Sequence, residues 1–102
     1  MAIEPVECGM RPGHPGEILR EELAELGLSA RAFAKALDIP VNRVTQIVNE
    51  QRGVTADTAL RLARYFGTSP EFWLNLQRSY DLKLARERSG GEIERLVKPR
   101  AA

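Results

Sequence analysis

Residues 29–49 of the chain, SARAFAKALDIPVNRVTQIVN, contain two short helical patterns that are separated by a break. Ser29 is a favourable N-cap, and the apolar residues of 30–37 recur with the period of a helix. Asp38-Ile39-Pro40 ends that helix, because proline disfavours a helical conformation at the residue before it. A second helix is expected directly afterwards, over 41–50. Two helices joined by so tight a turn predict a helix-turn-helix.

The two sides of the helix expected over 41–50 differ in chemistry. At about 100° of rotation per residue, Val44, Ile47 and Val48 lie on one side. Uncharged amides and a hydroxyl lie on the other, where an ordinary solvent-facing helix more often carries Glu and Lys. Amide side chains read adenine in the major groove through paired donor and acceptor contacts, so we interpret this side as a DNA-reading face rather than the solvated side of a packing helix. The predicted base-reading residues are Val41, Asn42, Thr45, Gln46 and Asn49.

Positive charge gathers around this pair of helices. The whole chain has a net charge of only +1, so it is not a generally basic nucleic-acid-binding chain. Residues 29–53 nevertheless carry four basic and two acidic side chains, whereas residues 15–26 carry one arginine and four glutamates. A helix N-terminus and nearby arginines are common contacts to phosphate, so the local excess fits a DNA backbone. The predicted phosphate-binding residues are Ser29, Arg31, Arg43, Arg52 and Thr55.

Three more helical patterns flank the pair. The first starts at Pro15, a residue suited to the first turn of a helix, and the other two start after the N-caps Thr55 and Ser69. The last of them is expected to extend to about Arg88, where Ser89-Gly90-Gly91 should stop it. The sequence shows no strand pattern and no internal repeat. We therefore predict an all-α, five-helix fold, with an N-terminal arm (1–13), a DNA-binding domain that includes a C-terminal dimerisation helix (14–88) and a flexible tail (89–102).

The composition argues against several classes of protein. The 102 residues, 43% hydrophobic and 28% charged, suit one globular domain with tails. No apolar run is long enough to cross a bilayer and the N-terminus has no signal-peptide pattern, so we expect a cytoplasmic protein without a membrane partner. Cys8 is the only cysteine and His14 the only histidine, so we expect no disulfide, no metal site, no cofactor and no enzyme activity. His14 is expected to be structural, at the entry to the first helix.

An apolar stripe with three aromatic residues follows Ser69 in the last helix. Phe72, Trp73, Leu76 and Tyr80 recur at helical spacing, which is typical of core packing and also of a subunit interface. We expect both, with Trp73 inside the domain. A helix-turn-helix homodimer is expected to bind a pseudo-palindromic operator in double-stranded DNA. The predicted dimer interface consists of Tyr80, Leu82 and Leu84.

Two blocks outside the helix-turn-helix have a more specific pattern. They are His14-Pro15-Gly16-Glu17-Ile18-Leu19 and Ser69-Pro70-Glu71-Phe72-Trp73-Leu74-Asn75-Leu76-Gln77, the second followed by Tyr80-Asp81-Leu82. Together with the helix-turn-helix and residues 54–63, they resemble the HigA-type antitoxins, also called the plasmid-maintenance antidote or virulence-associated protein I family, of the lambda-repressor-like Xre class. The resemblance covers about residues 14–85, most of the chain. It implies a homodimer that represses its own operon and neutralises a HigB-type toxin, an mRNA-cleaving ribonuclease.

Two positions depart from the family pattern. Asp38 stands in the turn where the class usually has glycine, but aspartate tolerates the left-handed backbone conformation and should preserve the turn. Asn49-Glu50 stands where the family favours Asn-Gly. That change allows the helix to continue to Gly53 and leaves the position of Arg52 open.

Two other functions stay open on the sequence alone. A stand-alone repressor would carry the same reading face, and only a neighbouring toxin gene would distinguish the antitoxin from it. A protein-interaction adaptor would use the same fold without binding DNA, because fold does not determine function. The amide stripe and its flanking arginines argue against the adaptor.

Overall fold

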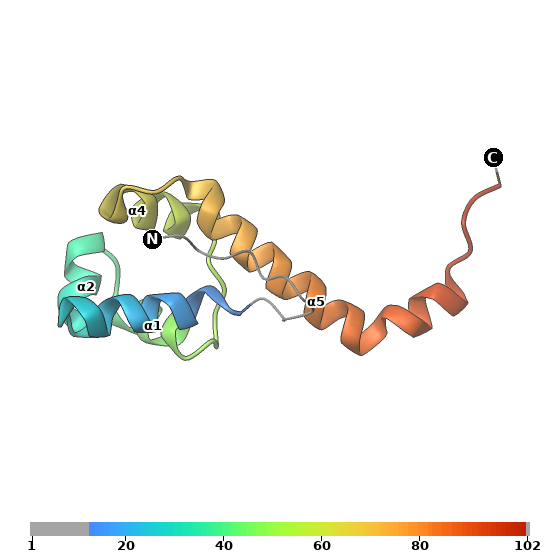
Figure 1. The fold of residues 1–102 in the computed structure, drawn as a ribbon, viewed down its shortest axis with the longest axis horizontal. Helices are drawn as coiled ribbons and strands as arrows, with labels where there is room; N and C mark the ends of the chain where they lie inside the picture. The colour runs from blue at the N-terminus through green and yellow to red at the C-terminus, as the bar shows by residue number, and fades with distance from the viewer. Residues whose placement is uncertain (1–12, 102) are drawn as a thin grey trace.

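Every regular element in residues 13–101, the part of the chain described by this computed structural model, is helical. The helices follow one another through short connections (Figure 1). The prediction of an all-α, five-helix fold is confirmed. The predicted N-terminal arm, with Cys8, lies outside the described residues except for Gly13. The helices are α1 Pro15–Leu26, α2 Ala30–Leu37, α3 Val41–Val48, α4 Ala56–Phe66 and α5 Pro70–Leu96.

Side chains cap the first backbone N–H groups of four helices. His14, Ser29, Thr55 and Ser69 each accept a hydrogen bond from the backbone N–H two or three residues further along the chain. Such caps satisfy donors that no earlier helical carbonyl can reach. The caps predicted at Ser29, Thr55 and Ser69 are therefore confirmed, and His14 is added to them.

One apolar core joins all five helices. Trp73, 2% exposed, contributes from α5, and its Nε1–H donates to Thr68 Oγ1 at 2.8 Å. A buried indole N–H usually finds such a partner. The prediction that Trp73 packs inside the domain is confirmed. The buried apolar residues are Leu19, Leu23, Phe33, Ala34, Leu37, Val44, Ile47, Val54, Ala59, Leu62, Ala63 and Trp73.

The start of α1 lies directly against the end of α3. A Cβ atom placed on Gly16 would lie 1.9 Å from the backbone oxygen of Ile47. Because that neighbour is backbone, it cannot swing aside as a side chain would. This approach explains why glycine follows His14-Pro15 in the block at the start of the first helix.

The end of α3 differs from the prediction. The helix stops at Val48 and does not continue to residue 50 or to Gly53. Glu50 has a φ of 61°, a left-handed conformation, and the Gln51 N–H bonds back to the Gln46 carbonyl at 2.7 Å. Glycine, which the family favours at this position, would adopt that conformation without steric cost.

The end of α5 also differs from the prediction. The helix does not stop near Arg88 but continues through Ser89-Gly90-Gly91 to Leu96, so part of the expected flexible tail is helical. Each glycine costs a helix only about 1 kcal/mol relative to alanine, and the flanking residues 85–88 and 92–96 are mostly strong helix formers. Propagation is cooperative, so the helix bridges this weak point. Pro99 then prevents much further extension.

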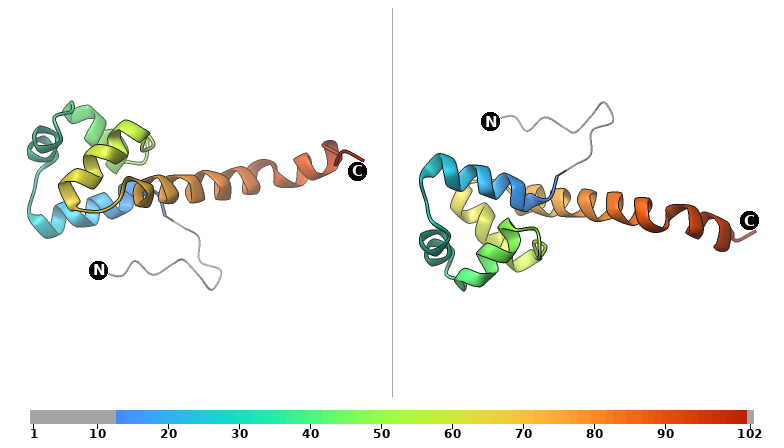
Figure 2. Two further views of the ribbon diagram at one scale, coloured as in Figure 1. Left: turned by 90° about the horizontal axis from the view of Figure 1, so that it is seen from above. Right: turned by 90° about the horizontal axis from the view of Figure 1, so that it is seen from below.

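Only part of α5 packs on the domain. Its N-terminal part contacts α4 and α1, whereas its C-terminal part projects away from the other helices (Figures 1 and 2). The molecule is accordingly elongated, with extents of 53 × 29 × 23 Å. Within residues 13–101, no helix is both long enough and apolar enough to cross a membrane.

Candidate nucleic-acid interface

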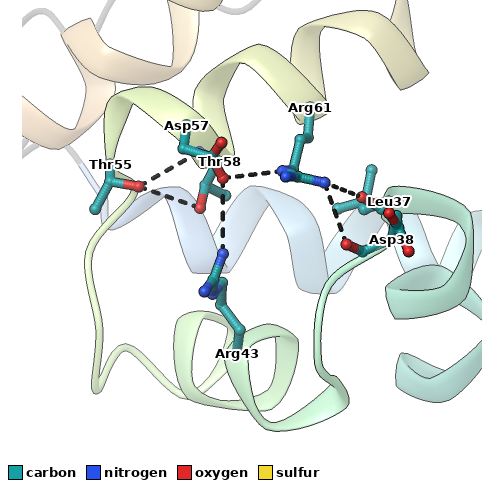
Figure 3. A network of polar contacts seen from close by, with 7 residues as sticks. All are labelled: Leu37, Asp38, Arg43, Thr55, Asp57, Thr58 and Arg61. Carbon is teal, nitrogen blue, oxygen red and sulfur yellow. Dashed lines mark hydrogen bonds and ion pairs between the residues drawn. The ribbon is translucent and has the colours of Figure 1, made fainter.

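The turn between α2 and α3 is fixed by its own backbone and by α4. Asp38 adopts a left-handed conformation, φ 59° and ψ 49°, so the prediction that aspartate preserves the turn is confirmed. The Asp38 N–H bonds to the Lys35 carbonyl at 3.1 Å. From α4, Nη1 of Arg61 donates to the carbonyl oxygens of Leu37 and Asp38 at 2.9 and 3.1 Å (Figure 3). The turn that sets the direction of α3 is therefore tied to α4.

Arg43 of α3 takes part in the same polar network. Asp57 accepts a hydrogen bond from Nε of Arg61 at 2.9 Å and lies 3.7 Å from Nη1 of Arg43 (Figure 3). The hydrogen bond from Arg61 and the positive charges of both arginines lower the pKa of Asp57 below its ordinary value. Arg43, one of the predicted phosphate contacts, is thus paired with the carboxylate in the first turn of α4.

The outward side of α3 carries the amide and hydroxyl groups that its periodicity predicts. Val44 and Ile47 face the core and are 2% and 1% exposed. Thr45 donates its hydroxyl proton to the carbonyl of Asn42 at 3.1 Å, which leaves its oxygen lone pairs as acceptors. The two-sided helix is confirmed, while its contacts with DNA stay a prediction. Of the five predicted base readers, Asn42 and Asn49 are exposed, and Val41, Thr45 and Gln46 are partly exposed.

Arg52 joins this face from the loop that follows α3. Its Nε–H donates to Oε1 of Gln46 at 2.8 Å. The left-handed turn at Glu50 brings the loop back along the helix, which allows a contact between residues six positions apart. The position of Arg52, which the sequence left open, is therefore beside the central amide of the reading face.

Two residues that are not among the predicted site residues hold this loop. Arg20 of α1 donates to the carbonyl of Val48 at the end of α3 and lies 3.8 Å from the carboxylate of Glu50. Gln77 of α5 accepts from the Val54 N–H through Oε1 at 2.8 Å. The two ends of the loop are thus attached to α1 and to α5.

The sequence did contain a signal for Gln77. Its Nε2 donates to Asp81 Oδ1 at 3.0 Å, and that bond orients the amide so that its oxygen faces the loop. Both residues belong to the block after Ser69 that a generic helix-turn-helix does not predict. Within that block, Gln77 and Asp81 thus fix the loop that follows α3.

The other predicted phosphate contacts lie at two helix N-termini. Ser29 caps α2 by accepting from the Ala32 N–H at 3.1 Å, and Arg31 is exposed in the first turn of that helix. Thr55 caps α4 by accepting from the Thr58 N–H at 3.3 Å. Free N–H groups at such ends favour an anion, so the geometry is compatible with phosphate contacts, which stay a prediction.

His14 and Tyr80 pack together at the start of α1. The His14 side chain is buried, its Nδ1 accepts from the Gly16 N–H at 2.9 Å, and its ring meets Tyr80 edge to face at a centroid distance of 4.9 Å. Burial lowers the pKa of His14, although the nearby charges of Glu50 and Asp81 oppose that effect. The structural role expected for His14 is confirmed.

The three predicted interface residues do not share one side of α5. Tyr80 contacts His14 within its own chain, Leu84 is partly buried, and Leu82 is 46% exposed. Two residues along a helix correspond to about 200° of rotation, so Leu82 lies nearly opposite both of its predicted companions. A dimer stays a prediction, and Leu82 is the interface residue that faces solvent in this structure.

Comparison with known proteins shows a consistent set of relatives. A family model described as Helix-turn-helix matches residues 19–73. Virulence-associated protein I of Dichelobacter nodosus is 63% identical over 88 residues, which cover 85% of this chain and 82% of the relative. Antitoxin HigA-1 of Vibrio cholerae is 41% identical over 91 residues, which cover 87% of this chain and 84% of the relative.

Solved structures give the same result. An addiction module antidote protein of the HigA family from Coxiella burnetii superposes with a TM-score of 0.84 at 62% identity, over 89% of this chain and 100% of that one. Antitoxin HigA of Pseudomonas aeruginosa, solved with the higBA promoter, also has a TM-score of 0.84, at 50% identity and with the same coverage of both chains. Both share the five-helix architecture described above.

Proposed function

This chain belongs to the HigA-type antitoxin family, and we propose on that premise that it binds operator DNA, represses its own operon and neutralises a HigB-type toxin. The observation that carries the DNA-binding part is the outward face of α3. Its amides and hydroxyl are exposed or partly exposed, while Arg61 holds the turn before the helix and Gln77 holds the loop after it. A rigid helix with a hydrogen-bonding surface suits the major groove.

The DNA-binding part is tested with the DNA upstream of the protein's own gene. A fluorescein-labelled duplex of that region should bind in the presence of excess unlabelled random DNA, and Gln46→Ala should lower the affinity for it by about 1–3 kcal/mol. Arg31→Ala should weaken binding to both duplexes and flatten the salt dependence, because it removes a phosphate contact. Equal affinity for the upstream and random duplexes would leave the chain without an operator and contradict the proposal.

The chain is also proposed to act as a homodimer in the cytoplasm, where its operator lies. A two-fold dimer presents two copies of α3, which suits a pseudo-palindrome with half-sites about one helical turn apart. Footprinting on the upstream duplex should then show two related protected segments. A single protected half-site at saturating protein would contradict this symmetry.

The toxin-binding part is tested by co-expression with the small open reading frame beside the gene. Growth arrest caused by that reading frame should be relieved by the wild-type chain. Relief should persist with Gln46→Ala, since neutralisation by protein contact does not need the DNA-reading face. If the neighbour is not toxic while operator binding is normal, the chain is a stand-alone repressor on the same fold.

A further inference from the structure

The pairing of Gln46 with Arg52 changes what the reading face offers to DNA. Gln46 is partly exposed on α3 and Arg52 is exposed in the following loop, and the two are joined by the 2.8 Å bond from Arg52 Nε to Gln46 Oε1. The backbone places them together, because the left-handed Glu50 turns the loop and Gln77 anchors the loop at Val54. The contact between the two side chains therefore depends on the backbone conformation of the loop.

The bond fixes the orientation of both groups. An N–H donor can bond only to the oxygen of an amide, so Oε1 of Gln46 faces Arg52 and its NH₂ group lies on the other side. Arg52 uses its Nε–H in this bond and keeps its two terminal amino groups free to donate. The pair thus presents predominantly hydrogen-bond donors.

Guanine and adenine differ in the groups they present in the major groove, so a set of donors and a free amide match different bases. Guanine presents two acceptors, N7 and O6, whereas adenine presents the acceptor N7 beside the N6 donor. A free glutamine matches adenine because it donates and accepts at once. Once its oxygen accepts from Arg52, glutamine is less suited to adenine, while the fork of the arginine matches the two acceptors of guanine.

We propose that Gln46 and Arg52 form one guanine-reading unit, in which Gln46 positions Arg52 so that Nη1 and Nη2 donate to O6 and N7 of a guanine in each half-site. This inference rests on the proposed DNA binding. It replaces the phosphate contact that the sequence alone suggests for Arg52. Gln46 is a positioning residue in this unit, and Arg52 contacts the base.

The base preference is measured by selecting duplexes from a randomised pool with the wild-type protein. Replacing the guanine that occupies one fixed position in each selected half-site by adenine should weaken binding by roughly 5- to 150-fold. Arg52→Ala removes the donors that would reach the guanine, so this variant should lose the preference. If Arg52→Ala instead weakens binding to all duplexes by one factor, Arg52 contacts phosphate and the proposal is wrong.

The positioning role is tested with two variants of Gln46. Gln46→Glu still offers an acceptor to Arg52 Nε, so its ratio of guanine to adenine binding should stay near that of the wild type, although the added charge lowers affinity for every duplex. Gln46→Ala should lose the preference for guanine over adenine, so its ratio of guanine to adenine binding should fall toward one. If both variants change the preferred base in the same way, Gln46 reads the base itself and the unit does not exist.

An atomic substitution in the DNA separates the base contact from indirect effects. Replacing that guanine by 7-deazaguanine removes only the N7 acceptor, and it should weaken binding of the wild type but not of Arg52→Ala. Equal weakening of both would overturn the proposal, as would a selected site without guanine. A wild-type protein that selects no sequence at all would instead contradict the proposed function.

Discussion

At the scale of single residues, two glycines should respond in opposite ways to the same substitution. Gly16→Ala places a methyl group 1.9 Å from the Ile47 carbonyl oxygen, which forces α1 and α3 apart. Overpacking of this kind costs about 1–3 kcal/mol. A methyl group on Gly91 of α5 would meet no atom within 4 Å, so Gly91→Ala should stabilise the helix by up to about 1 kcal/mol.

Urea unfolding of the two variants and the wild type measures both changes. Circular dichroism at 222 nm is a suitable signal, because all the described elements are helical. Equal free energies of unfolding for Gly16→Ala and the wild type would show that α1 and α3 are not in close contact.

The protonation of His14 should make stability depend on pH. The folded state lowers the pKa of His14 below its ordinary 6.5, chiefly because the ring is buried, so the unfolded chain binds the proton more tightly. The stability linked to neutral His14 is therefore complete above about pH 6.5 and is lost as the pH falls through the interval between 6.5 and the lower folded pKa. Protonation of Nδ1 would also remove the acceptor for the Gly16 N–H.

His14→Asn is the matched variant, because an asparagine oxygen can cap a helix without titrating in this range. Its free energy of unfolding should fall less than that of the wild type between pH 6.5 and pH 5. Titration of the His14 ring by NMR gives the folded pKa directly. A value at or above 6.5 would show that burial does not dominate.

Residue types on the reading face were predictable from the sequence, whereas their partners were not. A period of about 3.6 residues fixes which side chains of 41–48 point outward, whatever surrounds the helix. The bond between Arg52 and Gln46 depends on the conformation of the loop, and the bond that the Val54 N–H donates to Gln77 depends on a helix residue more than twenty positions away. Such contacts arise from tertiary packing, which no local pattern contains.

At the scale of elements, Asp57 determines where Arg43 points. The carboxylate holds Arg43 at 3.7 Å and adds a negative charge near the predicted DNA surface. Asp57→Asn removes this charge, yet its amide oxygen can still accept from Arg61. The variant should bind random DNA more tightly, and the slope of log K against log salt should become steeper by about one unit, because Arg43 becomes available to phosphate.

Fluorescence anisotropy over a range of salt concentrations measures this slope. The double variant Asp57→Asn with Arg43→Gln should return to the wild-type slope, which assigns the gain to Arg43. An unchanged slope in Asp57→Asn alone would place Arg43 away from the phosphate backbone.

Helix boundaries show where local signals suffice. Local sequence signals predicted several helix boundaries correctly, because a cap or a left-handed C-terminus depends on only a few neighbouring atoms. The correctly predicted boundaries are the starts of α2, α4 and α5 and the ends of α1, α2 and α4. The predicted end of α3 was wrong because Glu50 adopts a left-handed backbone conformation, which residues other than glycine do not favour. The predicted end of α5 was wrong because two glycines weaken a helix without requiring it to stop.

At the scale of the whole molecule, the projecting part of α5 exposes an apolar stripe. Leu82 and Ile93 are separated by eleven positions, about three helical turns, and therefore lie on one side of the helix. Leu82, Ile93 and Val97 are 46%, 52% and 63% exposed, and the side chains around them form a surface groove with Ala85 and Gly90. Exposed apolar surface of this kind is typical of a protein interface, so we expect the proposed dimer contact to extend well beyond Leu84.

Leu82→Glu should separate the proposed dimer without unfolding the chain. Leu82 is outside the core, so circular dichroism and the free energy of unfolding of the monomer should hardly change. A glutamate beside its symmetry mate would be desolvated and repelled, and sedimentation should show a monomer at micromolar concentration. Operator binding should then fall steeply, because one half-site supplies only part of the contact free energy.

Leu60→Glu is the control variant for Leu82→Glu. It changes an exposed leucine on α4, 60% accessible, and the variant should remain a dimer. If Leu82→Glu sediments as a dimer while the wild type does too, the two copies meet on another surface, and the stripe on α5 has a different partner.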